Sequence, residues 1–168
     1  MNGYELRELI GSKRPRYKEC YKPLMDKISQ KGDTSGKGGF SSFGAYYQTF
    51  MYAFVLGYRL GECKPLNADG DKGEKPSFAP LSNWKPTEVK DYILAILLNQ
   101  SKEMGYTWED LTEASDEALD AFALEMVRRM EGYANAGLEY LQYKWDNEEV
   151  LFHDPFVFVN ILEDLEKE

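Results

Sequence analysis

The sequence predicts an all-α fold, organised as a single compact domain of five or six helices around a buried central helix. Residues 38–58 predict that helix, because they contain no charged side chain but are too short and too rich in Tyr, Ser and Gln to cross a membrane. Apolar residues recur at spacings of three and four along much of the remaining chain, which indicates amphipathic helices. The 168 residues, of which 43% are hydrophobic, suffice to bury a substantial core.

The N-terminal part of the chain is expected to form two helices, over residues 3–10 and 15–28. The apolar residues of the second helix recur at three and four, and they are Tyr17, Tyr21, Leu24, Met25 and Ile28. Pro23 lies inside this helix and predicts either a kink or a fresh helical start, because proline lacks the backbone donor and crowds the preceding turn. The glycine-rich residues 32–42 predict a flexible loop.

The central helix is expected over residues 43–60, with Ser41 or Ser42 as its N-terminal cap and Gly61 at its end. Residues 62–86 contain four prolines and no periodicity, which predicts a long irregular loop. Four apolar residues are expected to anchor the ends of this loop, and they are Leu66, Phe78, Leu81 and Trp84.

Two further helices are expected before residue 115. The first covers residues 87–104, and the residues expected on its inner face are Val89, Tyr92, Ile93, Ile96 and Leu97. The second is short and begins at the sequence TWED, residues 107–110. This sequence fits a capping box, in which a threonine and an acidic side chain satisfy each other's backbone N–H groups.

The longest helix is expected over residues 116–145, where apolar residues form a single stripe. Gly132 and Gly137 interrupt it and predict either a kink or the close approach of a neighbouring helix. Asp154 and Pro155 predict the start of a final helix, whose apolar positions are Phe156, Val159, Leu162 and Leu165. The sequence FVFV that follows is β-branched and aromatic, so a short strand near the C-terminus is the alternative.

Several classes of site are excluded by residue content. Cys20 and Cys63 form no zinc pattern and are expected to be reduced, and His153 is the only histidine. Residues 32–38 lack the spacing of a phosphate-binding loop, and residues 67–78 lack the Gly and Glu of a calcium loop. We therefore expect no catalytic residue, no metal and no cofactor, and a protein that is not an enzyme.

The cellular location is suggested by the first residues, MNGYELREL. They include acidic residues where a signal peptide would carry a basic start and an apolar run. We therefore expect a cytoplasmic protein with no membrane partner.

The net charge of −9 is unevenly distributed. Residues 1–38 form a basic head with a charge of +4, whereas residues 39–168 carry −13 and disfavour binding of nucleic acid across the whole surface. The head contains a basic cluster that could contact a phosphate backbone or an acidic partner, and its members are Lys13, Arg14, Arg16 and Lys18. The alternative is a solvated face that balances the acidic helices.

Two segments, FGAYYQTFMYAFVLGYRLGECKPL and the later GYANAGLEYL, are similar to a pair of motifs from a known family. They resemble the small accessory proteins encoded beside bacterial DNA phosphorothioation clusters, the Dnd system-associated protein 4 family. In that family an apolar A-x-x-x-G-[YF] helix, a basic residue and P-L precede a late YANGG-L-x-x-L motif. Gly132 and Ala136 depart from this pattern. The matching residues, in segments that span about two-thirds of the chain, are Phe40, Phe50, Ala53, Gly57, Tyr58, Pro65, Leu66, Tyr133, Ala134, Asn135, Gly137, Leu138 and Leu141.

The resemblance implies an accessory role in defence, near modified DNA, and no known enzymatic activity. We therefore expect a non-enzymatic accessory or adaptor protein whose partner is another protein of the same system, with any weak DNA contact limited to the basic head. The alternative is a general protein-interaction module, unrelated to DNA, whose acidic surface binds a basic partner.

A homodimer is a further hypothesis, because the small residues around Gly137 would let two backbones approach each other. Tyr133 and Asn135 are the other candidate interface residues, and Asn135 is expected to form a hydrogen bond across an interface or to cap a break in the helix. The alternative use of the same face is burial against the chain's own central helix.

Overall fold

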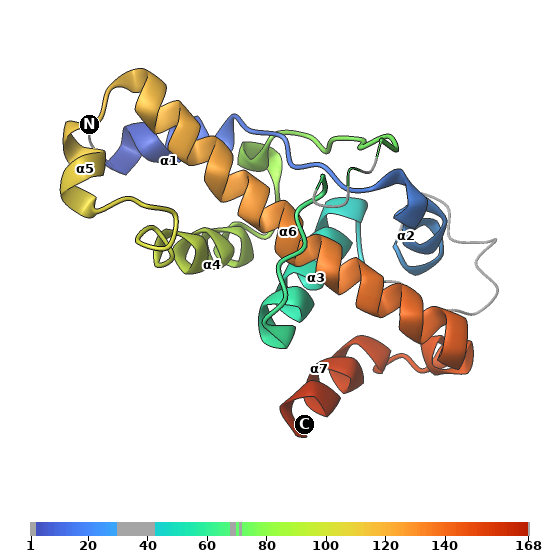
Figure 1. The fold of residues 1–168 in the computed structure, drawn as a ribbon. Helices are drawn as coiled ribbons and strands as arrows, with labels where there is room; N and C mark the ends of the chain where they lie inside the picture. Colours follow the sequence, from blue (N-terminus) through green and yellow to red (C-terminus); the bar gives the residue numbers. More distant parts are fainter. Residues whose placement is uncertain (1–2, 30–42, 68–69, 71, 168) are drawn as a thin grey trace. The chain divides into compact units, whose positions relative to one another are not determined.

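Seven α-helices and three 3-10 helices make up the part of the chain that the computed structural model describes, which is residues 3–29, 43–67, 70 and 72–167. These residues contain no β-strand, and their one isolated antiparallel bridge joins Arg16 to Ser77. The all-α prediction is therefore confirmed, with seven helices against the five or six expected. Figure 1 shows the predicted central helix as α3 (Tyr46–Leu60) and the predicted long helix as α6 (Asp116–Glu148).

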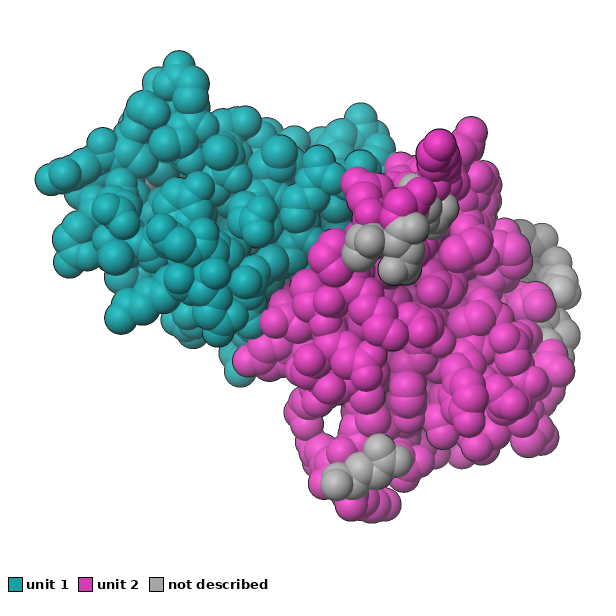
Figure 2. Space-filling model, in the orientation of Figure 1, with its two compact units in different colours: residues 1–16, 77–131 teal, residues 17–76, 132–168 magenta. Residues whose placement is uncertain are grey.

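The helices divide into two compact units, which Figure 2 distinguishes by colour. Unit 1 consists of residues 1–16 and 77–131, and unit 2 consists of residues 17–76 and 132–168. The division falls within α6, so this helix contributes to both units. The assignment of the whole chain to one domain stays a prediction.

Unit 1 contains α1 (Gly3–Gly11), α4 (Thr87–Leu98), α5 (Trp108–Glu113) and the first half of α6. The capping box predicted before α5 is present, because Thr107 Oγ1 accepts from the Asp110 N–H and Asp110 Oδ2 accepts from the Thr107 N–H, at 3.1 and 3.0 Å. The core of this unit is apolar, and its most buried members are Ile10, Leu81, Trp84, Ile93, Leu97, Leu111, Phe122 and Met126.

The inner face of α4 differs from the prediction. Tyr92 is 72% exposed and Val89 is 41% exposed, whereas Lys90 is buried together with Ile93 and Leu97. Apolar residues occupy most positions of this helix, so the spacing rule fits more than one face. Packing in unit 1 selects the face that includes Lys90.

Unit 2 contains α2 (Lys22–Ile28), α3, the second half of α6 and α7 (Val157–Lys167). The short-strand alternative for the sequence FVFV is wrong, because those residues begin α7 and lie with Val157, Phe158 and Ile161 buried at helical spacing. Gly61 ends α3 in the left-handed conformation, with φ of 70°, as predicted.

The helix expected over residues 15–28 begins later than predicted. In unit 1, Pro15 accepts a hydrogen bond from the Phe78 N–H, and in unit 2 the Tyr17 N–H donates to Pro76. The chain is therefore extended before a 3-10 turn, η1 (Glu19–Tyr21), leads into α2, which has Pro23 in its first turn. Pro23 marks a fresh helical start and not a kink.

The described residues of the segment 62–86 are irregular apart from a 3-10 turn, η2 (Leu81–Asn83), and its four predicted anchors are all buried: Leu66, Phe78, Leu81 and Trp84. The predicted loop 32–42 and its capping candidates Ser41 and Ser42 lie outside the described residues. At the start of α3, the Gln48 side chain accepts a hydrogen bond from the Ala45 N–H at 2.9 Å.

Candidate functional site

The two segments that carry the family resemblance pack against each other within unit 2. A Cβ atom on Gly57 of α3 would lie 1.8 Å from the Tyr133 carbonyl oxygen, and one on Gly137 of α6 would lie 1.8 Å from the Ala53 carbonyl oxygen. No side chain fits at either position, so the two glycines permit backbone contact between α3 and α6. The predicted close approach at Gly137 is confirmed, and the partner is the chain's own central helix. This face is therefore already covered, and a second copy cannot use Gly137 while α3 is in place.

Asn135 is 5% exposed and joins α6 to the segment that follows α3. Its Nδ2 donates to the Lys64 carbonyl oxygen at 2.8 Å, and the Lys64 N–H donates to the Gly132 carbonyl oxygen at 3.0 Å. The Lys64 ammonium in turn lies 2.8 Å from a Glu139 carboxylate oxygen, and this hydrogen bond raises the pKa of Lys64. Asn135 thus forms a hydrogen bond inside the unit, not across an interface between copies.

Tyr133 is half-buried and borders the same contact. Its ring meets those of Phe54 and Tyr58 edge-on, with centroids 5.5 and 5.7 Å apart. Tyr58 is 42% exposed, so part of this aromatic group faces solvent. Of the three candidate interface residues, Tyr133 retains partial access to solvent, whereas Asn135 and Gly137 are buried.

The basic cluster is largely engaged by partners in unit 1. The Arg16 side chain donates to both carboxylate oxygens of Glu131, at 3.1 Å each, and its backbone N–H adds a third bond of 2.8 Å. Arg14 Nε donates to the Phe78 carbonyl oxygen at 2.9 Å, and Lys13 forms an ion pair with Asp120. A phosphate contact by Arg16 would have to break its pair with Glu131.

The fourth basic residue, Lys18, belongs to unit 2 and is half-buried. The structure therefore brings Lys13, Arg14 and Arg16 together in unit 1 and assigns Lys18 to the other unit. Phosphate binding by the basic cluster stays a prediction.

Glu131 is a structural residue that sequence reasoning missed. Its side chain is only 2% exposed, in the middle of a helix whose polar residues are mostly on the surface. Its position in the sequence indicates burial. Glu131 follows Val127 by four residues and precedes Ala134 by three, and both of these residues are buried on the same face of α6. An acidic residue on the apolar stripe predicts a buried partner, since buried charges are normally paired.

Exposed apolar side chains gather between residues 150 and 159 of unit 2. We call this group the C-terminal surface, and its members are Val150, Leu151, Phe156 and Val159, which are 75, 40, 65 and 54% exposed. Val150 and Leu151 lie on a 3-10 turn, η3 (Glu149–His153), Phe156 immediately precedes α7, and Val159 lies in its first turn. The sequence placed Phe156 and Val159 among the apolar positions of the final helix, but both are exposed, because apolar residues occupy more than one face of this segment and packing buries Val157, Phe158 and Ile161 instead.

Hydrogen bonds hold the backbone of the C-terminal surface in place. The Asp154 carboxylate accepts from the Phe156 N–H at 2.8 Å and from Asn160 Nδ2 at 3.2 Å, which fixes the first turn of α7. Beneath it, the Tyr52 hydroxyl donates to the Phe158 carbonyl oxygen at 2.6 Å. Burial raises the pKa of Tyr52, so this hydroxyl remains a donor at neutral pH.

The surroundings of the C-terminal surface are acidic. Residues 132–168 hold two lysines and nine Asp or Glu, a net charge of −7. A hollow of about 270 Å³ lies beside η3 and α7, and Leu151 lines it together with the charged residues Lys144, Asp154, Glu163, Asp164 and Lys167. The net negative charge of this part of the chain, together with the exposed apolar side chains, suits a ligand that is itself apolar and basic.

Among the described residues, no three His, Cys, Asp or Glu side chains come together as metal ligands would, and no helix has the length and apolar content needed to span a bilayer. Cys20 and Cys63 are both exposed and form no disulfide with each other.

Comparison with known proteins identifies no relative. The sequence matches no protein-family model, and neither a curated protein nor a solved structure matches the chain. The resemblance to the Dnd system-associated protein 4 family stays a prediction.

Proposed function

We propose that this chain is a non-enzymatic adaptor of a bacterial defence system linked to DNA phosphorothioation, and that it acts in the cytoplasm by binding another protein of that system. The observation that carries the proposal is the C-terminal surface, a group of exposed apolar side chains in a part of the chain with a net charge of −7. One of them, Leu151, lines the hollow beside α7. The defence context comes from the family resemblance.

The occupant we propose for the C-terminal surface is a basic, partly apolar segment of the partner protein. Groups of exposed apolar side chains with a polar rim are characteristic of protein-interaction sites. The charge of −7 over residues 132–168 would attract a basic partner and repel DNA. In this proposal the partner, not the adaptor, makes the main contact with DNA.

The residues behind the family resemblance support a scaffold role. Gly57 and Gly137 lie at the contact between α3 and α6, and Asn135 holds the segment after α3. Such residues would maintain the shape of unit 2, whereas the C-terminal surface contains none of them. We expect partner choice to depend on the surface and stability to depend on the matched residues.

The test is co-expression with the proteins of a phosphorothioation cluster encoded beside this chain's gene, followed by co-purification. We expect the triple variant Val150→Ser, Phe156→Ser and Val159→Ser to lose the partner, and the complex to weaken as salt is raised. The matched control is Tyr92→Ser, which alters an equally exposed aromatic residue in unit 1.

Two results would overturn this proposal. Retention of the partner by the folded triple variant would remove the C-terminal surface as its site. A gene neighbourhood without DNA-modification proteins would remove the defence role and leave the alternative, a general protein-interaction module with an acidic surface that binds a basic partner.

Direct DNA contact through the basic cluster is a secondary proposal with its own test. If the basic cluster contacts phosphates, DNA binding should be weak. A plot of the logarithm of affinity against the logarithm of salt concentration should have a slope near −3, since each phosphate contact contributes about −0.9. The residues concerned are Lys13, Arg14, Arg16 and Lys18. Replacing Arg16 is unsuitable as a probe because it leaves Glu131 buried and unpaired. Arg14→Gln and Lys18→Gln are the informative variants, and absence of binding at about 50 mM salt would exclude direct contact.

A further inference from the structure

Lys90 is a charged residue of unit 1 whose side chain is mostly buried. It belongs to α4 and is 9% exposed. Its ammonium nitrogen is not among the buried side-chain atoms that lack a hydrogen-bond partner, and no ion pair joins it to a residue that the structure describes. The apolar stem is therefore buried while the charged end stays accessible to a ligand, as is common for lysine.

The carboxylates of α4 do not pair with Lys90. The positions three and four residues away on the helix are Pro86, Thr87, Ile93 and Leu94, and none is acidic. Of the two nearby acids of α4, Glu88 lies two positions away and does not share a face with Lys90, and Asp91 is bound to Arg7 of α1 at 2.7 Å.

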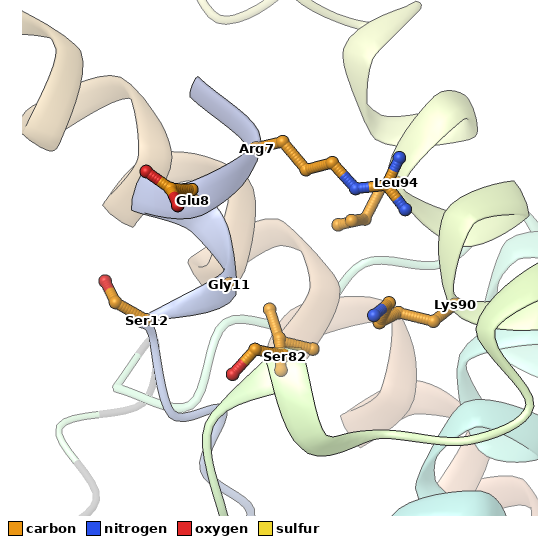
Figure 3. Close-up of a pocket in the computed structure, with 8 residues that line it drawn as sticks. Arg7, Glu8, Gly11, Ser12, Ser82, Lys90 and Leu94 are labelled. Carbon is orange, nitrogen blue, oxygen red and sulfur yellow. The ribbon is translucent and has the colours of Figure 1, made fainter. Parts of the chain in front are cut away.

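Lys90 lines a pocket of about 440 Å³ that α1, η2 and α4 form within unit 1. Figure 3 shows its side chain extending from α4 toward α1 and Ser82. Leu81 and Leu94 give the pocket an apolar part, and Arg7 and Ser82 add donors. Pockets of this size, largely apolar with a few convergent polar groups, are typical of small-molecule sites.

We propose that this pocket binds a small organic carboxylate, whose anionic group pairs with the Lys90 ammonium and whose apolar part lies against Leu81 and Leu94. A single negative charge is assigned because Glu8 also lines the pocket and has no partner among the described residues. A doubly charged phosphate would be repelled more strongly by Glu8. The site lies in unit 1 and does not depend on the adaptor proposal, which concerns unit 2.

The test compares three probes of similar shape, benzoate, phenyl phosphate and benzamide, by amide chemical-shift titration of the full chain. We expect benzoate to shift the amides of Leu81, Ser82 and Leu94, and to bind more tightly than phenyl phosphate or the neutral benzamide. Lys90→Met retains the apolar stem but removes the charge, and should weaken benzoate binding at least about tenfold. It should fold normally, because methionine keeps the buried apolar stem in place.

The controls separate this site from general attraction of anions. Lys102→Met removes an exposed lysine of the same unit and should leave benzoate binding unchanged. Ser82→Tyr places a large ring at the exposed rim and should block the pocket without changing the charge.

Three outcomes would overturn the proposal. Unchanged benzoate affinity in Lys90→Met, or equal loss in Lys102→Met, would show that Lys90 has no specific role. Absence of any shift at about 10 mM benzoate would show that the pocket takes no such ligand. Equal or tighter binding of phenyl phosphate would contradict the carboxylate assignment.

Discussion

Units 1 and 2 hold other segments against α6 by different physical means. In unit 2, Gly57 and Gly137 let α3 and α6 meet backbone to backbone, a contact that involves no charge. In unit 1, the extended segment that ends at Arg16 is held by the pair between Arg16 and the buried Glu131. The backbone contact between α3 and α6 therefore depends on the absence of side chains, whereas the Arg16–Glu131 ion pair requires two matched residues far apart in sequence.

The largest effect is expected at the steric contact. Gly137→Ala would place a Cβ atom 1.8 Å from the Ala53 carbonyl oxygen, and a backbone atom cannot move aside as a side chain can. We expect the free energy of unfolding of unit 2 to fall by at least about 4 kcal/mol, measured by native-state hydrogen exchange.

Gly132→Ala is the matched control on the same helix. Its Cβ atom would meet the Cys63 Sγ at 2.5 Å, and Sγ belongs to an exposed side chain that can rotate away. Its effect should stay within about 1 kcal/mol of zero, because alanine also favours the helix. An equal loss of unfolding free energy in the two variants would show that the contact of Gly137 with α3 is no tighter than the contact of Gly132 with Cys63.

The next effect concerns the ion pair of unit 1. Arg16→Ala leaves the Glu131 carboxylate buried without its cation, and we expect a loss of about 3 kcal/mol by chemical denaturation. Arg14→Ala, which removes one hydrogen bond to the Phe78 carbonyl oxygen, should cost less. The double variant Arg16→Met with Glu131→Met should recover most of the loss, since paired burial is replaced by apolar packing. Failure of the double variant to recover would indicate that Arg16 acts through contacts other than Glu131.

The same comparison separates what the sequence could predict from what it could not. Gly137 was predicted to permit a close approach because a glycine inside a helix has few other uses, and this local signal was sufficient. The partner of Arg16 was not predicted, because Glu131 is separated from it by 115 positions and only the fold brings them together. Helix type and most boundaries follow from local spacing, whereas pairings between distant segments do not.

The candidate sites show the same limit. Lys90 escaped notice because apolar residues fill most of α4, and the choice of buried face depends on packing that the spacing does not encode. The C-terminal surface was missed for the same reason. Exposure of Phe156 and Val159 is a property of how α7 packs, and not of the residues themselves.

A smaller effect is expected at alkaline pH, and it should be confined to unit 2. Burial, followed by the charges of Cys20 and Glu139, raises the pKa of Tyr21 from 10.0 to about 12, and burial also raises the pKa of Tyr52. Because the unfolded chain loses these protons first, the free energy of unfolding should fall as pH rises from about 10 to about 12.

Tyr52→Phe tests this pH dependence. It should cost about 2 kcal/mol at neutral pH, because the buried Phe158 carbonyl oxygen loses its donor, and it should make the alkaline decline shallower. Denaturation at a series of pH values checks both effects. An unchanged alkaline slope in the variant would mean that Tyr52 titrates normally.

The smallest effect is expected in unit 1, at the start of α5. Thr107→Ala removes the hydroxyl that accepts from the Asp110 N–H, and we expect a loss of about 1 kcal/mol in unit 1. Hydrogen bonds from Thr107 also lower the pKa of Asp110, so the stability they provide is present above the ordinary carboxyl pKa and is lost as pH falls. The larger cause, the hydrogen bond from the Thr107 backbone N–H, remains in the variant, so the pKa of Asp110 should rise only part of the way toward its ordinary value, measured by NMR titration. Thr107→Ser retains the hydroxyl and should preserve both properties, whereas unchanged stability in Thr107→Ala would show that the hydroxyl does not cap α5 in solution.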